Sequence, residues 1–318
     1  MAAKRILLVH GLASKPPARD LHALWTRCLT ANLRAEAPQA VASLGRADLE
    51  ALFETVYWAN AVPSHLEDPP EAVAALRRAV DRVIRERRRR GGDFHIRPGA
   101  RFKAFVKDRA VDLVDALSTA LTIKDEVVQK VLEEVRLYAH DQYVADRIRA
   151  PLEQALRRAW DEGAEVAVLA HSMGTFVAYD VLWRFSWRSE PEYAAYRDRR
   201  VALFATLGSP LGDREVQRLL FGERYRGEAR RFPVNVRRWH NYAALGDIVA
   251  HDSTLTDDFF APMRSLGLLG PEEEATRDYV RLANPYVSPR TGRPNPHKSY
   301  GYLVQPKLAK WLGRFLEA

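Results

Sequence analysis

Ala170-His171-Ser172-Met173-Gly174 stands directly after the apolar run Glu165–Leu169 and directly before Thr175–Leu182, whose apolar pattern is that of a helix. A strand, a turn of the form small-x-Ser-x-Gly and a helix, in this order, are typical of a nucleophile elbow. The turn is so tight that the residues two before and two after the serine must be small, and Ala170 and Gly174 meet this need. The stretch therefore predicts that Ser172 is a nucleophile. The alternative interpretation is a serine that only caps a helix N-terminus.

A serine nucleophile that attacks a carbonyl also needs backbone donors for the oxyanion that develops. The elbow leaves the Met173 N–H at the start of a helix, where it can donate to that charge. The first apolar run of the chain ends at His10-Gly11-Leu12, where Gly11 allows the backbone to approach a substrate closely. We therefore expect the backbone N–H groups of Leu12 and Met173 to form the oxyanion hole.

Short apolar runs alternate with helical patterns along the chain, which predicts an α/β fold with a mostly parallel central sheet flanked by helices. The runs are apolar nearly throughout, as expected of strands covered on both faces. The expected strands are 5–10, 54–58, 166–169, 201–206 and 239–245, with 279–282 as a further candidate, and the expected helices include 21–36, 150–161 and 306–316.

The interval between Trp58 and Val166 is much longer than one crossover helix with its loops requires. It contains two apolar stripes at helical spacing, one over residues 102–121 and one over residues 127–138. We interpret residues 63–142 as a helical insertion that forms a cap. The alternative is that these stripes pack only against the helices of the sheet.

A serine hydroxyl needs a base, and in elbow enzymes the acid and then the histidine follow the serine along the chain. Of the nine histidines, six precede the serine or lie in the elbow, where the side chain of His171 points away from the serine. His240 falls inside an expected strand. His297 lies in a loop just before the C-terminal helix and is the favoured base, with His251 as the alternative.

The acid that orients the histidine is expected at the carboxyl end of a strand, because that edge of a parallel sheet faces the ligand crevice. Asp247 follows the expected strand 239–245 and is favoured. Asp252, five residues later, is the alternative. For either residue, a carboxylate that merely caps a loop or forms a surface ion pair is the competing interpretation.

Composition places the chain among globular proteins, with 318 residues, 47% of them hydrophobic, and a single cysteine, Cys28. One cysteine excludes an internal disulfide framework and a Cys-rich metal site. The N-terminal apolar run is too short for a signal peptide, and no run is long enough to cross a bilayer, so a cytoplasmic location is expected.

The formal net charge is +8, and its sharpest cluster is Arg87-Arg88-Arg89-Arg90, followed by two glycines. Such a cluster can contact phosphate or an anionic membrane surface as a peripheral partner. The alternative is a solvated helix end, where cations are favourable and glycine stops the helix. Nucleic acid is disfavoured, because no zinc-finger spacing or RNA-binding aromatic motif accompanies the arginines.

Taken together, these motifs resemble the α/β-hydrolase superfamily, in particular bacterial lipases and esterases. The resemblance rests on His-Gly at 10–11, the elbow at 170–174, Thr-Leu-Gly-Ser-Pro-Leu at 206–211, Asp247 after its strand, and His297 followed by Tyr300. It implies an α/β-hydrolase core over residues 1–62 and 143–318, and cleavage of a small-molecule or lipid carboxylic ester through an acyl-enzyme. It implies no cofactor and no metal.

Other functions remain open on the sequence alone. The same Ser172, His297 and Asp247 would serve an acyltransferase, a thioesterase or an amidase, because a triad does not select the leaving group. A partner-binding protein of this fold, in which the stripes of the insertion form an interface, is a further alternative, since a fold does not certify a function.

Overall fold

The computed structural model describes residues 3–12, 15–62, 65–91, 94, 137–269 and 275–318. Its centre is a six-stranded sheet in the order β2-β1-β3-β4-β5-β6, and every neighbouring pair is parallel. The strands are β1 (Lys4–Val9), β2 (Phe53–Val56), β3 (Glu165–His171), β4 (Leu203–Leu207), β5 (Trp239–Ala244) and β6 (Thr276–Leu282). The α/β class with a parallel sheet, predicted from the alternating runs, is confirmed.

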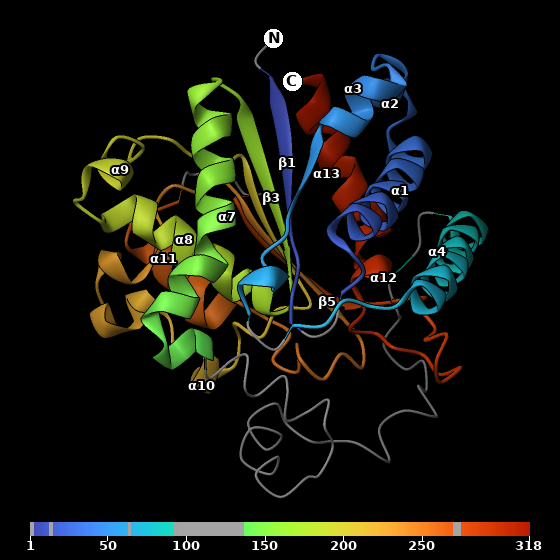
Figure 1. The fold of residues 1–318 in the computed structure, drawn as a ribbon. Coiled ribbons are helices and arrows are strands. Elements are labelled where there is room, and N and C mark those ends of the chain that lie inside the picture. The colour runs from blue at the N-terminus through green and yellow to red at the C-terminus, as the bar shows by residue number, and fades with distance from the viewer. Residues whose placement is uncertain (1–2, 13–14, 63–64, 92–93, 95–136, 270–274) are drawn as a thin grey trace, which may run out of the picture.

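Helices cover both faces of this sheet (Figure 1). The longer ones are α1 (Ala18–Glu36), α4 (Pro70–Arg90), α7 (Gln142–Asp161), α8 (Met173–Trp187) and α13 (Pro306–Glu317). Short helices and turns join them: α2 (Pro38–Ala42), α3 (Arg46–Ala51), η1 (Ala59–Ala61), α9 (Pro191–Ala194), α10 (Arg214–Gln217), η2 (Phe221–Tyr225), η3 (Ala229–Arg231), η4 (Thr256–Phe260), α11 (Ala261–Ser265) and α12 (Ser299–Leu303).

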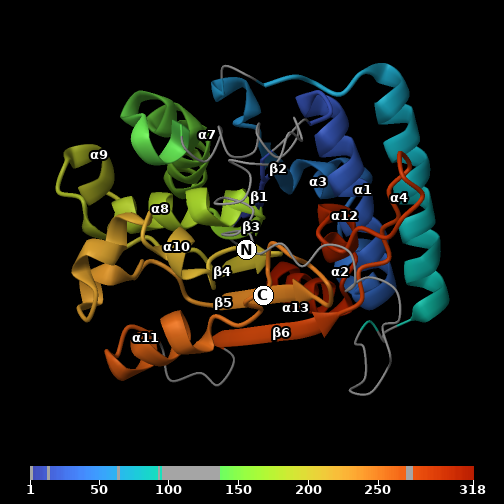
Figure 2. The same ribbon diagram turned by 90° about the horizontal axis from the view of Figure 1, so that it is seen from below.

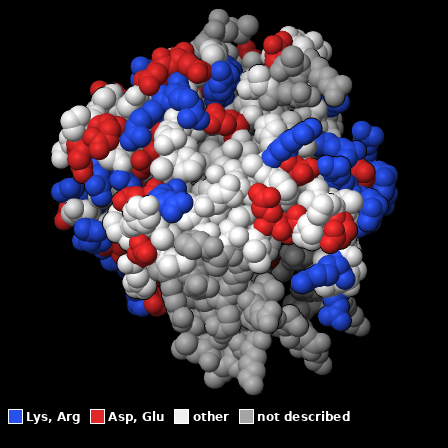
Figure 3. Space-filling model, in the orientation of Figure 1, with Lys and Arg blue, Asp and Glu red and all other residues white. Residues whose placement is uncertain are grey.

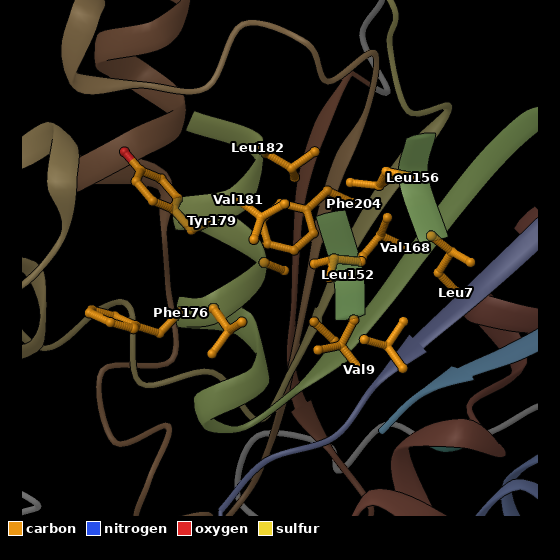
Figure 4. Close-up of a cluster of buried hydrophobic side chains, with 14 of the residues drawn as sticks. Leu7, Val9, Leu152, Leu156, Val168, Phe176, Tyr179, Val181, Leu182 and Phe204 are labelled. Atoms are coloured by element: carbon orange, nitrogen blue, oxygen red, sulfur yellow. The ribbon is translucent and has the colours of Figure 1, made fainter. Parts of the chain in front are cut away.

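Alternate residues of each central strand pack into one of two hydrophobic cores, because successive side chains of a strand point to opposite faces. In β1, Leu7 and Val9 pack with α7 and α8, whereas Ile6 and Leu8 pack with α1, α4 and α13. Figure 4 shows the first of these cores, where Leu182 of α8 and Leu156 of α7 lie close to Phe204 of β4. Burial on both faces explains why the central strands β1, β3 and β4 are apolar nearly throughout.

The start of α7 differs most from the expectation. Helix α7 begins at Gln142, eight residues before the predicted start, and Pro151 lies inside it rather than near its first turn. The physical reason is the cap: the Asp141 carboxylate accepts a hydrogen bond from the Val144 N–H at 3.0 Å. Aspartate is among the strongest N-cap residues, because its carboxylate satisfies a free N–H of the first turn. The expected start of this helix at residue 150 is wrong.

The predicted insertion 63–142 is described only in part. Its helix α4 packs on α1, and Val80 and Val83 are buried in the same core as Ile6. Tyr138, at the other end, is buried and donates a hydrogen bond to Asp180 of α8 at 2.9 Å. Residues 95–136, which carry most of both apolar stripes, lie outside the described residues, so the cap stays a prediction.

The strand order reverses between β1 and β3, because the chain builds the sheet outward from β1 in both directions. In open parallel sheets, ligands bind outside the carboxyl ends of the strands at such a reversal. Figure 2, seen from below, looks onto these carboxyl ends. None of the described helices combines the length and the apolar composition needed to cross a bilayer.

Candidate active site

Ser172 stands at the reversal point, in the turn between β3 and α8. Its backbone has φ 56° and ψ −132°, a conformation that residues with a side chain rarely adopt. Holding such a residue costs roughly 1–3 kcal/mol, which the surrounding hydrogen bonds must offset. The Ser172 N–H donates to the Leu207 carbonyl of β4 at 3.0 Å, and the Thr175 N–H donates to the Ser172 carbonyl at 2.9 Å. The turn has the geometry expected of an elbow.

Two glycines are required by the close packing of this turn. A Cβ placed on Gly174 would lie 2.4 Å from the His10 carbonyl oxygen, and one on Gly11 would lie 2.6 Å from the Cβ of Ser172. Neither distance is tolerable, and the first contact is with rigid backbone. The end of β1 and the start of α8 therefore touch only because both positions lack a side chain.

His297 meets the serine from the segment that precedes α12. Its Nε2 lies 2.9 Å from the Ser172 Oγ, so a hydrogen bond joins the two side chains. Two asparagines fix this segment. The Asn284 side chain donates to the carbonyls on either side of His297, that of Pro296 at 2.6 Å and that of Lys298 at 2.9 Å. The Asn295 side chain accepts from the His297 N–H at 3.1 Å.

Asp247 lies behind the imidazole, just past the end of β5. Both of its carboxylate oxygens are 3.0 Å from the Nδ1 of His297. The Tyr302 hydroxyl donates to Oδ2 at 2.5 Å, and the Val249 N–H donates to Oδ1 at 3.0 Å. Burial favours the neutral carboxyl, but His297 and the hydrogen bonds from His297 and Tyr302 outweigh it and lower the pKa of Asp247 to about 2. The carboxylate is therefore ionised at neutral pH.

The two alternative residues from the sequence lie elsewhere. His251 is half-exposed and its Nε2 faces Asp213 at 3.6 Å. Asp252 is exposed, and its carboxylate accepts from the Thr254 N–H at 3.4 Å as a loop cap. The structure thus brings together Ser172, His297 and Asp247, the combination that chain order favoured.

The expected oxyanion donors lie on the two segments that meet at the serine. Met173 is the first residue of α8, and the first N–H groups of a helix have no partner within the helix. Leu12 follows Gly11, whose backbone is packed against Ser172. The roles of both N–H groups in catalysis stay predictions.

His10 holds the peptide that carries the Leu12 N–H. Its Nε2 accepts from the Trp58 N–H at 3.1 Å, so its Nδ1 carries the proton and donates to the Gly11 carbonyl at 2.8 Å. Burial lowers the pKa of His10 well below its ordinary value, which keeps this tautomer neutral. In a trans peptide the carbonyl and the following N–H point in opposite directions. Fixing the Gly11 carbonyl therefore also fixes the direction of the Leu12 N–H.

Sequence reasoning missed two side chains that support the three central ones. Tyr302 donates to Asp247 and accepts from the Ala244 N–H at 2.9 Å. His171 lies beside the His297 ring, with centroids 4.8 Å apart, and its Nε2 is 2.6 Å from the His297 carbonyl oxygen. Burial, with the nearby His297 ring, lowers the pKa of His171, so its neutral ring donates this bond. No spacing rule links these distant positions, so the sequence carried no signal for them.

The low pKa of Asp247 predicts a stability change in acid. An unfolded aspartate has a pKa near 3.9, so the ionised carboxylate stabilises the fold above about pH 4 by about 2–3 kcal/mol, and this is lost as pH falls toward 2. Chemical unfolding at a series of pH values should therefore show a steeper acid loss for the wild type than for Asp247→Asn. Parallel curves for the two proteins would contradict the assigned environment of Asp247.

Within the described residues, no group of three or more His, Cys, Asp or Glu side chains is placed to hold a metal ion. Comparison with known proteins found no matching family model, no matching curated protein and no matching solved structure. The site is therefore interpreted from its own geometry.

Proposed function

We propose that the chain is a serine hydrolase with an α/β-hydrolase fold, which cleaves a carboxylic ester of a small molecule or lipid through an acyl-enzyme. The observation that supports this best is the unbroken path of hydrogen bonds from Ser172 Oγ to His297 Nε2 and from His297 Nδ1 to Asp247. The path begins at an elbow where the serine has φ 56°. A serine, a base and an orienting acid in this relation activate a hydroxyl for attack on a carbonyl.

In the first half of the reaction, the Ser172 Oγ attacks the ester carbonyl carbon while its proton passes to the Nε2 of His297. The oxyanion that forms accepts hydrogen bonds from the N–H groups of Leu12 and Met173. Asp247 holds the Nδ1 proton in place and stabilises the imidazolium. The tetrahedral intermediate then expels the alcohol, which takes the proton from Nε2, and the acyl group remains on Ser172.

In the second half, water replaces the alcohol. The water oxygen attacks the acyl carbon while His297 takes a proton from the water. The same proton passes to the Ser172 Oγ when the bond between the acyl carbon and Oγ breaks. The free acid leaves and the hydroxyl is restored.

A fluorophosphonate probe tests the nucleophile, since it reacts only with an activated serine. We expect the full-length protein to be labelled once, on the peptide that contains Ser172. A panel of p-nitrophenyl esters of increasing chain length then tests ester cleavage. Failure of both assays would overturn the proposal and favour a partner-binding protein, whereas labelling without ester cleavage would favour a thioester, an amide or an acyl acceptor other than water.

His171 offers a prediction about the placement of the base. Replacing it with leucine removes the donor to the His297 carbonyl with little change in volume, and should lower kcat roughly tenfold while KM changes little. His171→Gln carries an N–H donor at a similar reach, and should recover most of the loss. Both variants should first be compared with the wild type by circular dichroism.

The two substitutions separate a positioning role from simple packing. Equal losses in His171→Leu and His171→Gln would mean that the ring acts only by filling space. Unchanged kcat in folded His171→Leu would mean that Asn284 and Asn295 hold the His297 segment without it.

A further inference from the structure

A groove of about 590 Å³ lies between α4 and the segment 283–296, which leads to His297. One wall is cationic and is formed by four arginines of α4 together with Glu86. The other wall is mainly apolar and is formed by Leu245, Tyr286, Val287 and prolines. Its inner edge includes Pro296, directly before His297, so the groove adjoins the backbone that carries the base.

The arginine run that was conspicuous in the sequence is largely committed to internal contacts. Arg87 is buried, pairs with Glu36 and donates to the Asn32 side chain at 3.0 Å. Arg89 and Arg90 each form an ion pair with Glu86 at 2.7 Å. The hydrogen bonds from Arg89 and from Arg90 lower the pKa of Glu86 to about 2. Gly91, with φ 63°, then ends the helix. The solvated helix end therefore accounts for most of this run.

Of the arginines that line the groove, Arg82 and Arg85 remain available. Both are exposed, both line the groove, and neither forms an ion pair with any residue that the structure describes. Burial raises the pKa of Tyr286 to about 12, and the positive charge of Arg82 opposes that rise. The Arg82 guanidinium is therefore close enough to Tyr286, on the apolar wall, to interact with it. The one carboxylate in the groove, Glu86, does not balance four guanidinium groups.

These cations belong to a longer stripe on α4. Arg78, Arg82, Arg85 and Arg89 recur at spacings of four, three and four residues, which places them on one helix face over about 16 Å. Figure 3 shows Lys and Arg side chains gathered on this side of the molecule. Like charges at these spacings repel one another, and an anionic surface laid along the helix would relieve that repulsion.

Exposed apolar side chains lie in segments that follow the carboxyl ends of the strands. Ile248 follows β5, Val287 follows β6, and Leu66 belongs to a segment that pairs with the chain just after β1. Their exposed fractions are 48%, 36% and 68%. Val287 also lines the groove, so exposed apolar and cationic side chains meet there. This composition suits a membrane interface, where phosphates lie outside the acyl chains.

We propose that the groove and the Arg78–Arg89 face of α4 bind the phosphate headgroups of an anionic phospholipid bilayer. Guanidinium groups give paired donors that match phosphate oxygens, and the apolar wall accepts the glycerol and upper acyl carbons. Leu66, Ile248 and Val287 enter the interfacial layer, so the carboxyl edge of the sheet faces the membrane. The binding does not depend on the proposed hydrolase activity.

Sedimentation with vesicles tests this surface directly. The full-length protein should bind vesicles of phosphatidylcholine with about 30% phosphatidylglycerol much more tightly than pure phosphatidylcholine, and lose this preference at high salt. Arg82→Ala/Arg85→Ala should weaken binding roughly 30-fold, from about fivefold for each cation near an anionic surface. The matched control is Arg199→Ala/Arg200→Ala, which removes the same charge from exposed positions between α9 and β4. Helix α9 lies on the opposite side of the molecule from α4 (Figure 2).

Three results would overturn the proposal. Equal binding to both kinds of vesicle would remove the anionic bilayer as the occupant. Equal losses in the two double variants would mean that attraction follows net charge rather than this groove. Stabilisation of the wild type by inorganic phosphate, absent in Arg82→Ala/Arg85→Ala and without vesicle binding, would assign the groove to a free phosphate ester. Ester cleavage is not measured, so none of these outcomes bears on Ser172.

Discussion

Ser172→Ala should abolish ester cleavage and fluorophosphonate labelling while the protein remains folded. Loss of the nucleophile from a serine triad lowers kcat by a factor on the order of 10⁶, because the remaining groups cannot form the acyl-enzyme. The strained backbone of the elbow is retained, since alanine also carries a Cβ and keeps φ near 56° at the same cost. Initial rates with p-nitrophenyl esters and a thermal unfolding curve check the two parts of this expectation.

The matched control is Ser265→Ala, which removes a hydroxyl from an exposed position on α11. It should leave both labelling and cleavage unchanged. Retention of more than about a tenth of the wild-type rate in folded Ser172→Ala would assign the nucleophile to another residue, since a triad without its serine cannot retain that much activity.

The sheet could be predicted from sequence because its central strands are buried on both faces. Runs such as Ile6–Val9 and Val166–Ala170 are apolar at successive positions, and both cores need them. The order of the strands and the reversal beside β1 could not be read from those runs. They follow from which helix packs on which face, and this depends on contacts between residues far apart in the chain.

The central residues of the site could be predicted because each carries a local signal. Ser172 lies in a five-residue turn motif, Asp247 follows a strand, and His297 precedes the last helices. The supporting residues have no such signal. Tyr302 reaches Asp247 across 55 positions, and His171 reaches the His297 carbonyl across 126. Only the folded packing brings those pairs together.

The charge pattern shows why a run of residues in a helix has to be interpreted at helical spacing. Four consecutive arginines allowed two interpretations, an anion-binding cluster and a solvated helix end, and consecutive residues of a helix point in different directions. Arg87 consequently faces Asn32 in the interior, while the exposed face of α4 carries Arg82 and Arg85. Helical spacing, rather than the run itself, identifies the cations that face outward.

Asp247→Asn should lower kcat by about 10⁴ without unfolding the protein at neutral pH, as the equivalent exchange does in a well-studied triad. Both Asp247 oxygens lie within hydrogen-bond distance of the His297 Nδ1 and accept from its N–H. An amide also has to accept from the Tyr302 hydroxyl and the Val249 N–H. With one oxygen it cannot serve all three donors. Its NH₂ then faces Nδ1, so the proton moves to Nε2, where it blocks removal of the Ser172 proton.

Asp252→Asn is the matched control, because it makes the same exchange five residues later at an exposed loop cap. Its loss in kcat should be less than about tenfold, as for other surface substitutions. The pH dependence of the residual rate adds a second test. Asp247→Asn should recover activity as pH rises and hydroxide replaces the base. A large loss in Asp252→Asn with a small one in Asp247→Asn would transfer the orienting role to Asp252.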